Sequence, residues 1–276
     1  MRIAIVGHGF VGKAVEYGFS SCTKHIIDPL YGNSIQDLQS INPEATFVCV
    51  PTPMSDTGAI DSSILEEVVT ELQNTVTGLI VIKSTATPDI IQRLTQTYGG
   101  GRVVYNPEFL TEKNACQDFV NPPFHIFGGD PGSTKHLEKI YNEHSMCLPC
   151  PSFHVTPREA SFIKYGINTF LASKVLWFNQ FKDIVDANGC NFNRIIKAIS
   201  ADDRVGASHI LAPGFDGKKG YGGACFPKDT AALANFAGTF SILEKVIEEN
   251  NLYRSQYEKD DREKAQNVSY TTSSEK

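Results

Sequence analysis

The cysteine in GYGGACFPKDT, residues 220–230, stands in a setting that suits a nucleophile. Pro227 favours the first turn of a helix, so Cys225 would lie just before the helix N-terminus. The helix dipole and the nearby Lys228 would stabilise a thiolate there. Asp229 would fall in the first turn, where a carboxylate is favoured. These residues leave two interpretations open: a nucleophile site, or an ordinary helix start with a small apolar cysteine.

Lys164 and Asn168 are a second pair of candidate functional residues. They lie in REASFIKYGINTFLASKVLWFNQFKDIVDANG, which predicts a long helix that ends at Gly189. Their i, i+4 spacing places them on one face. Polar groups on so apolar a helix are costly to bury, so they either reach solvent at one edge or point into a polar pocket. The spacing leaves both arrangements open. Because the helix is apolar on more than one side, we expect it to be buried between domains or in a subunit interface.

A glycine motif near the N-terminus predicts a dinucleotide site. The strand RIAIV leads into GHGFVG, and a helical pattern and the strand HIID follow. Gly7 permits the tight turn, Gly9 lets the backbone approach a pyrophosphate, and Gly12 lets the helix pack against the strand. Asp28 would accept hydrogen bonds from a ribose hydroxyl and repel a 2′-phosphate, which favours NAD over NADP. The alternative is a chance glycine turn with a surface aspartate.

Strands and helices continue to alternate along the first half of the chain. Strands are predicted in ATFVCV, GLIVIK, GRVVY and FHIFGG, with helices between them. In the helix SSILEEVVTELQNTV, the predicted apolar stripe is Ile64, Val68 and Leu72. This order predicts an α/β fold with a Rossmann-type, doubly wound, mostly parallel sheet covered on both faces. Ligands bind beyond the carboxyl ends of such strands, so the loops PTP, KST and NPEFL are the informative ones.

The strand signal fades at about residue 155, and an all-helical domain follows. We expect an NAD-binding domain over 1–154 and a helical central domain that carries the cysteine loop over 155–255. The segment 256–276 is polar, and its composition does not favour folding on its own. It is expected to be a tail, with its order left open.

Composition narrows the possible functions. The chain has a formal net charge of −6 and no basic block, which argues against general nucleic-acid binding. No apolar run is long enough to cross a membrane, and seven scattered cysteines indicate reduced thiols, so we expect a cytoplasmic protein. Cys147 and Cys150 form a lone CxxC without a second pair, so no metal site is predicted.

Six motifs occur in the order found in UDP-glucose 6-dehydrogenases, a nucleotide-sugar dehydrogenase family. They are GHGFVG with a following Asp, KSTAT, NPEFLTE, EASFIKYGINTFLASK, DDRVG and GYGGACFPKDT. The chain resembles the first two of that family's three domains, from residue 1 to about 253. We expect it to lack the third, UDP-binding domain. The resemblance implies oxidation of UDP-glucose to UDP-glucuronate with two NAD. Because GDP-mannose and UDP-N-acetylhexosamine dehydrogenases share the core, the sugar and the base stay open.

The resemblance also implies the chemistry at Cys225. Its thiolate would add to the aldehyde made by the first hydride transfer, the thiohemiacetal would give up a second hydride, and water would hydrolyse the thioester. Lys164 would stabilise the developing oxyanion, helped by Asn168. Three further residues would position and activate water: Asp229, Thr85 and Glu108.

The remaining residues implied by the resemblance bind ligands. Those expected at the cofactor are Gly7, Gly9, Phe10, Val11, Gly12, Asp28, Thr52, Ser84, Thr85, Glu112 and Lys228. Those expected at the substrate are Phe109, Leu110, Lys164, Asn168, Arg204, Tyr221 and Gly222. Lys83 would lie near the cofactor or the substrate. Arg204 would reach the substrate of a neighbouring subunit. The apolar helix around 160–188 is then the expected homodimer surface.

Two other interpretations compete with this one. β-Hydroxyacid dehydrogenases also join a Rossmann domain to a helical domain, but they transfer one hydride and need no cysteine nucleophile. A catalytically inactive NAD-binding remnant is the second alternative. The set of Cys225, Lys164, Asn168, Asp229 and Glu108 argues against it, because an inactive module has no evident chemical reason to keep all five.

Overall fold

A computed structural model describes residues 1–97 and 101–271, with their side chains except that of residue 112. The chain divides into two compact units. The first comprises Met1–Thr52 and Asp61–Lys164, and the second comprises Pro53–Ile60 and Tyr165–Lys276. The domain boundaries expected after residues 154 and 255 stay predictions.

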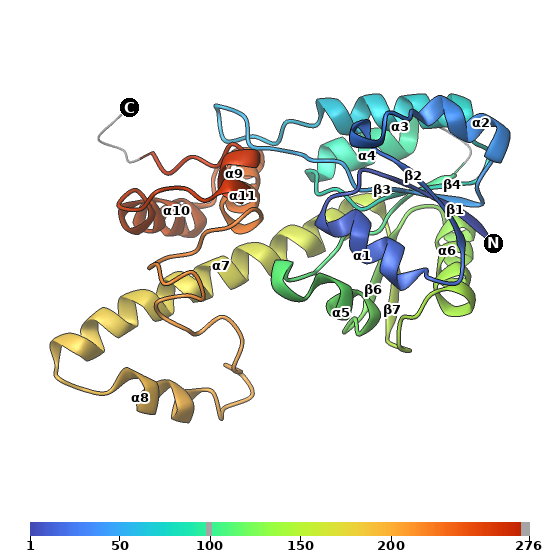
Figure 1. Ribbon diagram of the computed structural model, residues 1–276. Helices are drawn as coiled ribbons and strands as arrows, with labels where there is room; N and C mark the ends of the chain where they lie inside the picture. The colour runs from blue at the N-terminus through green and yellow to red at the C-terminus, as the bar shows by residue number, and fades with distance from the viewer. Residues whose placement is uncertain (98–100, 272–276) are drawn as a thin grey trace. The chain divides into compact units, whose positions relative to one another are not determined.

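The first unit is built on one sheet, which among the described residues has seven strands in the order β2-β1-β3-β4-β5-β6-β7 (Figure 1). Every neighbouring pair is parallel except β5 and β6, which meet antiparallel at Tyr105 and Gly128. This confirms the mostly parallel sheet. The strands are β1 Arg2–Val6, β2 Thr23–Ile27, β3 Ala45–Val48, β4 Leu79–Ile82, β5 Val103–Tyr105, β6 His125–Gly128 and β7 Ser152–Val155. Strand order reverses at β1 and β3, where ligands bind in open α/β sheets.

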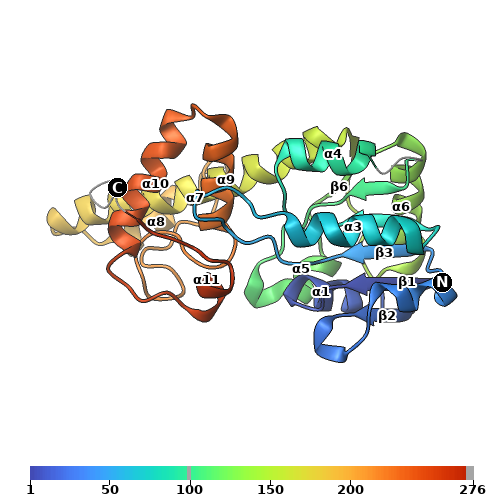
Figure 2. The same cartoon turned by 90° about the horizontal axis from the view of Figure 1, so that it is seen from above.

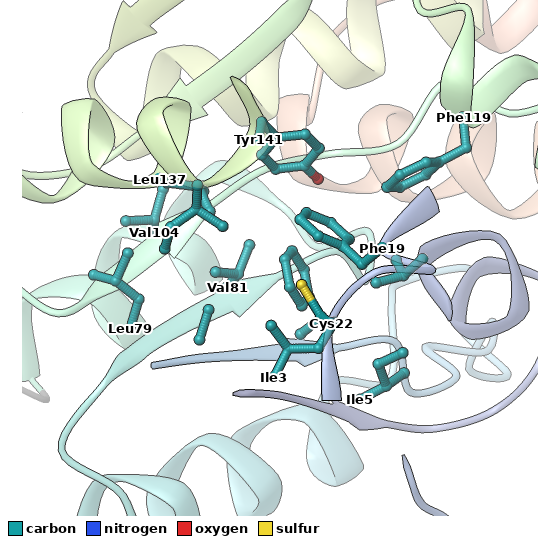
Figure 3. Packing of buried hydrophobic residues seen from close by; sticks show 14 of the residues in the cluster. Ile3, Ile5, Phe19, Cys22, Leu79, Val81, Val104, Phe119, Leu137 and Tyr141 are labelled. Atoms are coloured by element: carbon teal, nitrogen blue, oxygen red, sulfur yellow. The ribbon is translucent and has the colours of Figure 1, made fainter. Parts of the chain in front are cut away.

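Helices cover both faces of this sheet. In Figure 1, α3 and α4 lie on one face, and α1, α5 and α6 lie on the other. Their bounds are α1 Phe10–Gly18, α2 Leu38–Ile41, α3 Ser63–Thr75, α4 Pro88–Thr97, α5 Ala115–Val120 and α6 Pro131–His144, with the short 3-10 turns η1 Pro29–Tyr31, η2 Ile35–Asp37 and η3 Glu112–Asn114. The central core lies on the α1, α5 and α6 face, where Phe19 packs with Phe47, Phe119 and Tyr141 (Figure 3).

The buried stripe of α3 differs from the predicted one. Leu65, Val69 and Leu72 face the sheet, whereas Ile64 is 42% exposed. The sequence allows both stripes, because SILEEVVTEL places an apolar residue before each of the first two members of the buried set. Packing against the sheet selects the stripe one residue later, so the predicted stripe of Ile64, Val68 and Leu72 is wrong in two positions.

The second unit is helical. Its helices are α7 Pro157–Ala187, which begins in the first unit, α8 Phe192–Ile199, α9 Phe226–Ala237, α10 Ser241–Arg254 and α11 Asp261–Ala265. The excursion 53–60 from the first half of the chain lies beside α9 (Figures 1 and 2). There the side chain of Asn235 donates to the Thr57 carbonyl at 3.3 Å. None of the described helices combines the length and the apolar character needed to span a bilayer.

The segment from residue 256, expected to be a polar tail with its order left open, contains a further helix. It forms α11, whose capping box joins Asp260 and Glu263. Val268 is fully buried, and the Met54 amide donates to the Gln266 carbonyl at 2.9 Å. A few long-range contacts therefore fix a segment whose composition alone does not favour folding.

Candidate active site

The glycine turn after β1 has the geometry of a dinucleotide site. Gly7 has φ +89°, and a Cβ on it would lie 2.6 Å from the Cys49 carbonyl oxygen at the end of β3. A Cβ on Gly12 would lie 2.1 Å from the Gly7 carbonyl oxygen. Gly9, the N-cap of α1, is different, because a Cβ there would meet no atom within 4 Å. Two glycines are therefore needed for packing, and the third leaves space above the helix N-terminus.

Asp28 directly follows β2, at the position where a dinucleotide-binding unit has its acidic residue. Its carboxylate accepts from the His8 amide at 2.8 Å and the Leu30 amide at 3.0 Å. These hydrogen bonds hold its pKa below the usual range, so the carboxylate is ionised. The His8 ring hydrogen-bonds the Tyr31 hydroxyl at 2.7 Å and Glu16 at 2.8 Å, a role that sequence reasoning did not predict.

The residues present fit a bound NAD. The first amides of α1 and the space above Gly9 suit a pyrophosphate, since helix N-termini favour anions. Asp28 is a half-buried, ionised acceptor for ribose hydroxyls and would repel a 2′-phosphate. Phe10 and Val11 begin α1 and are half-buried.

We expect Gly12→Ala and Gly9→Ala to separate packing from cofactor binding. Gly12→Ala pushes α1 away from β1, so the free energy of unfolding should fall by about 2 kcal/mol or more. Gly9→Ala should cost less than about 1 kcal/mol, yet raise the Kd for NAD about tenfold or more, because its methyl group occupies the approach to the helix N-terminus. Urea unfolding and NAD titration measure the two effects. Equal losses of stability in both variants would contradict this assignment.

The loops after β3 and β4 are tied together by buried hydroxyl groups. Thr52 donates to the Thr85 carbonyl at 2.8 Å, and Ser84 donates to the Val50 carbonyl at 2.7 Å. All three predicted cofactor residues here, Thr52, Ser84 and Thr85, are buried. The side chain of Glu112, also predicted to bind the cofactor, lies outside the described residues.

Lys164 and Glu108 form a buried ion pair in the first unit. The ammonium of Lys164 lies 3.0 Å from Glu108 Oε1 and donates to the Glu108 carbonyl at 2.6 Å. Their side chains are 2% and 6% exposed. Glu108 Oε2 accepts from the Leu110 amide at 2.7 Å, and the Lys164 ammonium lies 5.3 Å from the centre of the Phe109 ring. The structure therefore brings together the predicted cation, the predicted carboxylate and the NPEFL loop.

A cavity of about 210 Å³ opens beside this loop. Glu108, Phe109 and Leu110 line one part, and Lys83 and His125 line another. Lys83 is buried and donates to the neutral side-chain oxygen of Asn106 at 2.9 Å. Burial lowers the pKa of Lys83 to about 8. Burial first, and then the charge of Lys83, lower the pKa of His125 to about 4.

The titration of Lys83 gives a test by pH. The folded pKa is about 8 and the ordinary value is 10.5, so the unfolded chain binds more protons between these values. The free energy of unfolding contributed by Lys83 must therefore rise with pH across this window and be level below it. We expect the free energy of unfolding of wild type, minus that of Lys83→Met, to rise by up to about 3 kcal/mol as the pH is raised from about 8 to 10.5. Urea unfolding at a series of pH values measures this difference. A level or falling difference would contradict the depressed pKa.

In the second unit, Cys225 lies at the N-terminus of α9. The helix begins at Phe226, with Cys225 as its N-cap and Pro227 in the first turn, which confirms the predicted helix start. Asp229 is fully buried in that turn. Its carboxylate accepts from the Lys228 ammonium at 2.7 Å and from Nδ2 of the Asn168 side chain at 2.7 Å. Asn168 therefore points into a polar site. This is one of the two arrangements that its spacing left open.

Arg204 and Tyr221 are also predicted to bind the substrate. Arg204 is exposed, and its guanidinium pairs with Asp202. Tyr221 is buried, and its hydroxyl group donates to Thr230 at 3.4 Å.

Cys147 and Cys150 are thiols, and burial raises the pKa of each, which disfavours the thiolate that a redox or metal role needs.

The sequence matches two models of one protein family. Residues 32–145 match the NAD binding domain of the UDP-glucose/GDP-mannose dehydrogenase family, and residues 158–252 match the central domain of the same family. The two matches are consecutive and take in the NPEFL loop, α7 and the cysteine loop.

Individual proteins agree with these matches. A UDP-glucose 6-dehydrogenase of Rickettsia felis is 34% identical over 234 residues, which are 80% of this chain and 49% of that protein. The UDP-glucose 6-dehydrogenase TuaD of Bacillus subtilis is 29% identical, with 92% of this chain and 63% of TuaD covered. A solved UDP-glucose dehydrogenase from Pyrobaculum islandicum superposes with a TM-score of 0.78 at 25% identity, over 91% of this chain and 68% of that one. The chain thus spans about half to two thirds of the two curated relatives.

Proposed function

Because the chain belongs to the UDP-glucose/GDP-mannose dehydrogenase family and carries its NAD binding domain, we propose that it oxidises UDP-glucose to UDP-glucuronate with NAD. One primary alcohol, two NAD⁺ and one water give one carboxylate, two NADH and three protons. The observation that carries the proposal is the half-buried Cys225 at the start of α9, followed in the same turn by the buried Lys228 and Asp229.

The cysteine solves a chemical problem of the second oxidation. NAD, when bound, supplies the hydride acceptor. An aldehyde has no carbon-bound alcohol from which a second hydride can leave. The Cys225 thiolate forms a carbon–sulfur bond with the aldehyde carbon, and the carbonyl electron pair moves to oxygen. Loss of a hydride from this thiohemiacetal gives a thioester, and addition of water then releases the carboxylate and restores the thiol.

Lys164 and Asn168 are proposed to stabilise the oxyanion. They lie one turn apart on α7, and each side chain is buried and held by a carboxylate. Preorganised donors of this kind cost little reorganisation when charge develops on oxygen. Asp229, Glu108 and Thr85 are proposed to position water and accept its proton. Both carboxylates have the fixed hydrogen bonds that such a role needs.

Substrate contacts are proposed for the residues near these groups. Phe109 and Leu110 line the cavity and would contact the sugar nucleotide. Tyr221 and Gly222 would contact it from the cysteine loop. Arg204 would reach the substrate of a second copy of the chain.

We propose a homodimer formed through α7. Supporting this, α7 exposes the large apolar side chains of Phe170, Trp177 and Ile184, which are 67%, 55% and 62% exposed. Apolar exposure on this scale is typical of an interface. We place the reaction in the cytoplasm, because it needs a reduced thiol.

The proposal is tested by assaying the purified protein with NAD and a panel of nucleotide sugars. UDP-glucose, GDP-mannose and UDP-N-acetylmannosamine are compared by absorbance at 340 nm, and the acid product is quantified by mass spectrometry. We expect two NADH per carboxylate, with UDP-glucose the best substrate. A preference for another sugar would replace UDP-glucose in the proposal. One NADH per substrate would indicate a single-step dehydrogenase, and no reduction of NAD would indicate an NAD-binding remnant.

A further inference from the structure

The loop that leads to Cys225 is held by two residues of α10. The Asn250 side chain is fully buried, accepts from the Tyr221 amide at 2.7 Å and donates to the Tyr221 carbonyl at 3.1 Å. The Arg254 guanidinium, 2% exposed, lies 2.7 Å from Asp216. We define residues 216–225 as the cysteine loop. These contacts hold the loop through the side chain of Asp216 and through the backbone of Tyr221.

A third contact comes from Glu263 of α11. Its Oε1 accepts from the Gly223 amide at 3.1 Å, two residues before Cys225. The same oxygen accepts from Arg254 and from the Tyr270 hydroxyl, each at 2.7 Å. The Glu263 side chain is 1% exposed. A buried carboxylate is stable only with such partners, so Glu263 joins the cysteine loop, α10 and residue 270.

The ion pair between Arg254 and Glu263 also explains why residue 222 is a glycine. A Cβ on Gly222 would lie 2.0 Å from Arg254 Nη2 and 2.6 Å from Glu263 Oε1. Gly222 therefore makes room for the ion pair between Arg254 and Glu263, in addition to the substrate contact proposed for it. Gly223 has φ +81°, a conformation that favours glycine and turns its amide toward Glu263.

The segment that supplies Glu263 and Tyr270 is itself anchored. Glu263 Oε2 accepts from the Asp260 amide at 2.9 Å, and the Val268 amide donates to the Glu263 carbonyl at 2.9 Å. The Lys259 ammonium donates to the Val268 carbonyl at 3.0 Å. Glu263 is therefore held by contacts within its own segment as well as by the loop.

From these contacts we propose that the segment 260–270 holds the cysteine loop in its reactive geometry, with Glu263 as the positioning residue for Cys225. The inference deepens the proposed function, on which its catalytic part rests. Glu263 touches no reacting atom in this proposal. It fixes the Gly223 amide and thereby the backbone that enters α9 at Cys225. If the loop is released, the thiol no longer lies in register with the helix N-terminus, which stabilises its thiolate.

The test compares Glu263→Gln with the control Asp261→Asn. Asp261 is on the same helix, but its side chain is fully exposed in a 3.7 Å surface pair with Lys264. Alkylation of Cys225 by iodoacetamide is followed by peptide mass spectrometry from pH 6 to 10, with the exposed Cys190 as internal reference. In Glu263→Gln, we expect the pH midpoint of Cys225 alkylation to rise by about half a unit or more. Its kcat should fall about tenfold or more, with the Kd for NAD unchanged. The control should match wild type.

Each outcome decides the proposal. A folded Glu263→Gln protein with the alkylation profile and kcat of wild type would overturn it. If Glu263→Gln does not fold, Tyr270→Phe, which removes one hydrogen bond to Glu263 Oε1, is measured in the same way; unchanged values there would overturn it equally. Because alkylation needs no substrate, it tests the positioning of Cys225 even if no nucleotide sugar is oxidised. Failure of the proposed function is thereby distinguished from failure of this inference.

Discussion

Cys225→Ala should abolish carboxylate formation, with a loss of about 10³-fold or more in the rate of acid production. Without the thiol, the aldehyde has no group that converts it to a tetrahedral species able to release a second hydride. NAD binding should be unchanged, because the glycine turn and Asp28 lie in the other unit. The measurement is acid product by mass spectrometry together with NADH by absorbance.

Cys190→Ala is the matched control for this variant. Cys190 is exposed, follows α7, and hydrogen-bonds only weakly to the Asn188 carbonyl at 3.6 Å. We expect wild-type acid production from it. Acid production near the wild-type rate by Cys225→Ala would exclude the covalent route, because the carboxylate would then form without a thioester on Cys225.

Lys164→Met should have the second largest effect, on both activity and stability. Removing the cation leaves Glu108 buried without its partner, which should cost about 3–5 kcal/mol in the free energy of unfolding. Loss of an oxyanion donor should lower kcat a further 10²–10³-fold, by the usual order of magnitude for such donors. Urea unfolding and steady-state kinetics at a temperature where the variant is folded measure the two effects.

Two further variants separate these effects. Lys164→Met with Glu108→Leu replaces both charges, so most of the lost stability should return while activity stays low. Lys182→Met, on the same helix in a surface pair with Asp186, should change stability by less than about 1 kcal/mol. Recovery of activity in the double variant would contradict a catalytic role for Lys164.

The start of α9 was predictable because its signals are local. Pro227 and the glycines before it are enough to place Cys225 at the helix start, and no distant residue is needed. The Rossmann order was predictable for the same reason, because the strand, the glycine turn and the helix follow one another directly in the sequence. Local signals of this kind therefore located both the cysteine and the dinucleotide turn.

The partners of the site residues were not predictable from spacing. Lys164 meets Glu108 at a separation of 56 residues, and Asn168 meets Asp229 at a separation of 61. The stripe of α3 was missed because two apolar stripes compete. The order of the segment from residue 256 was left open because its polar composition does not reveal that Glu263 contacts Arg254 and Gly223. In each case the deciding contact comes from another part of the fold.

The most direct test of the account is to look for an acyl group on Cys225. Asp229→Asn should slow the proposed hydrolysis, because it removes the buried carboxylate proposed to activate water. Incubation with NAD and UDP-glucose should then give a protein with added mass equal to the acyl group, and peptide mass spectrometry should place that mass on Cys225. Carboxylate production without any adduct on Cys225, or an adduct on another residue, would contradict the account.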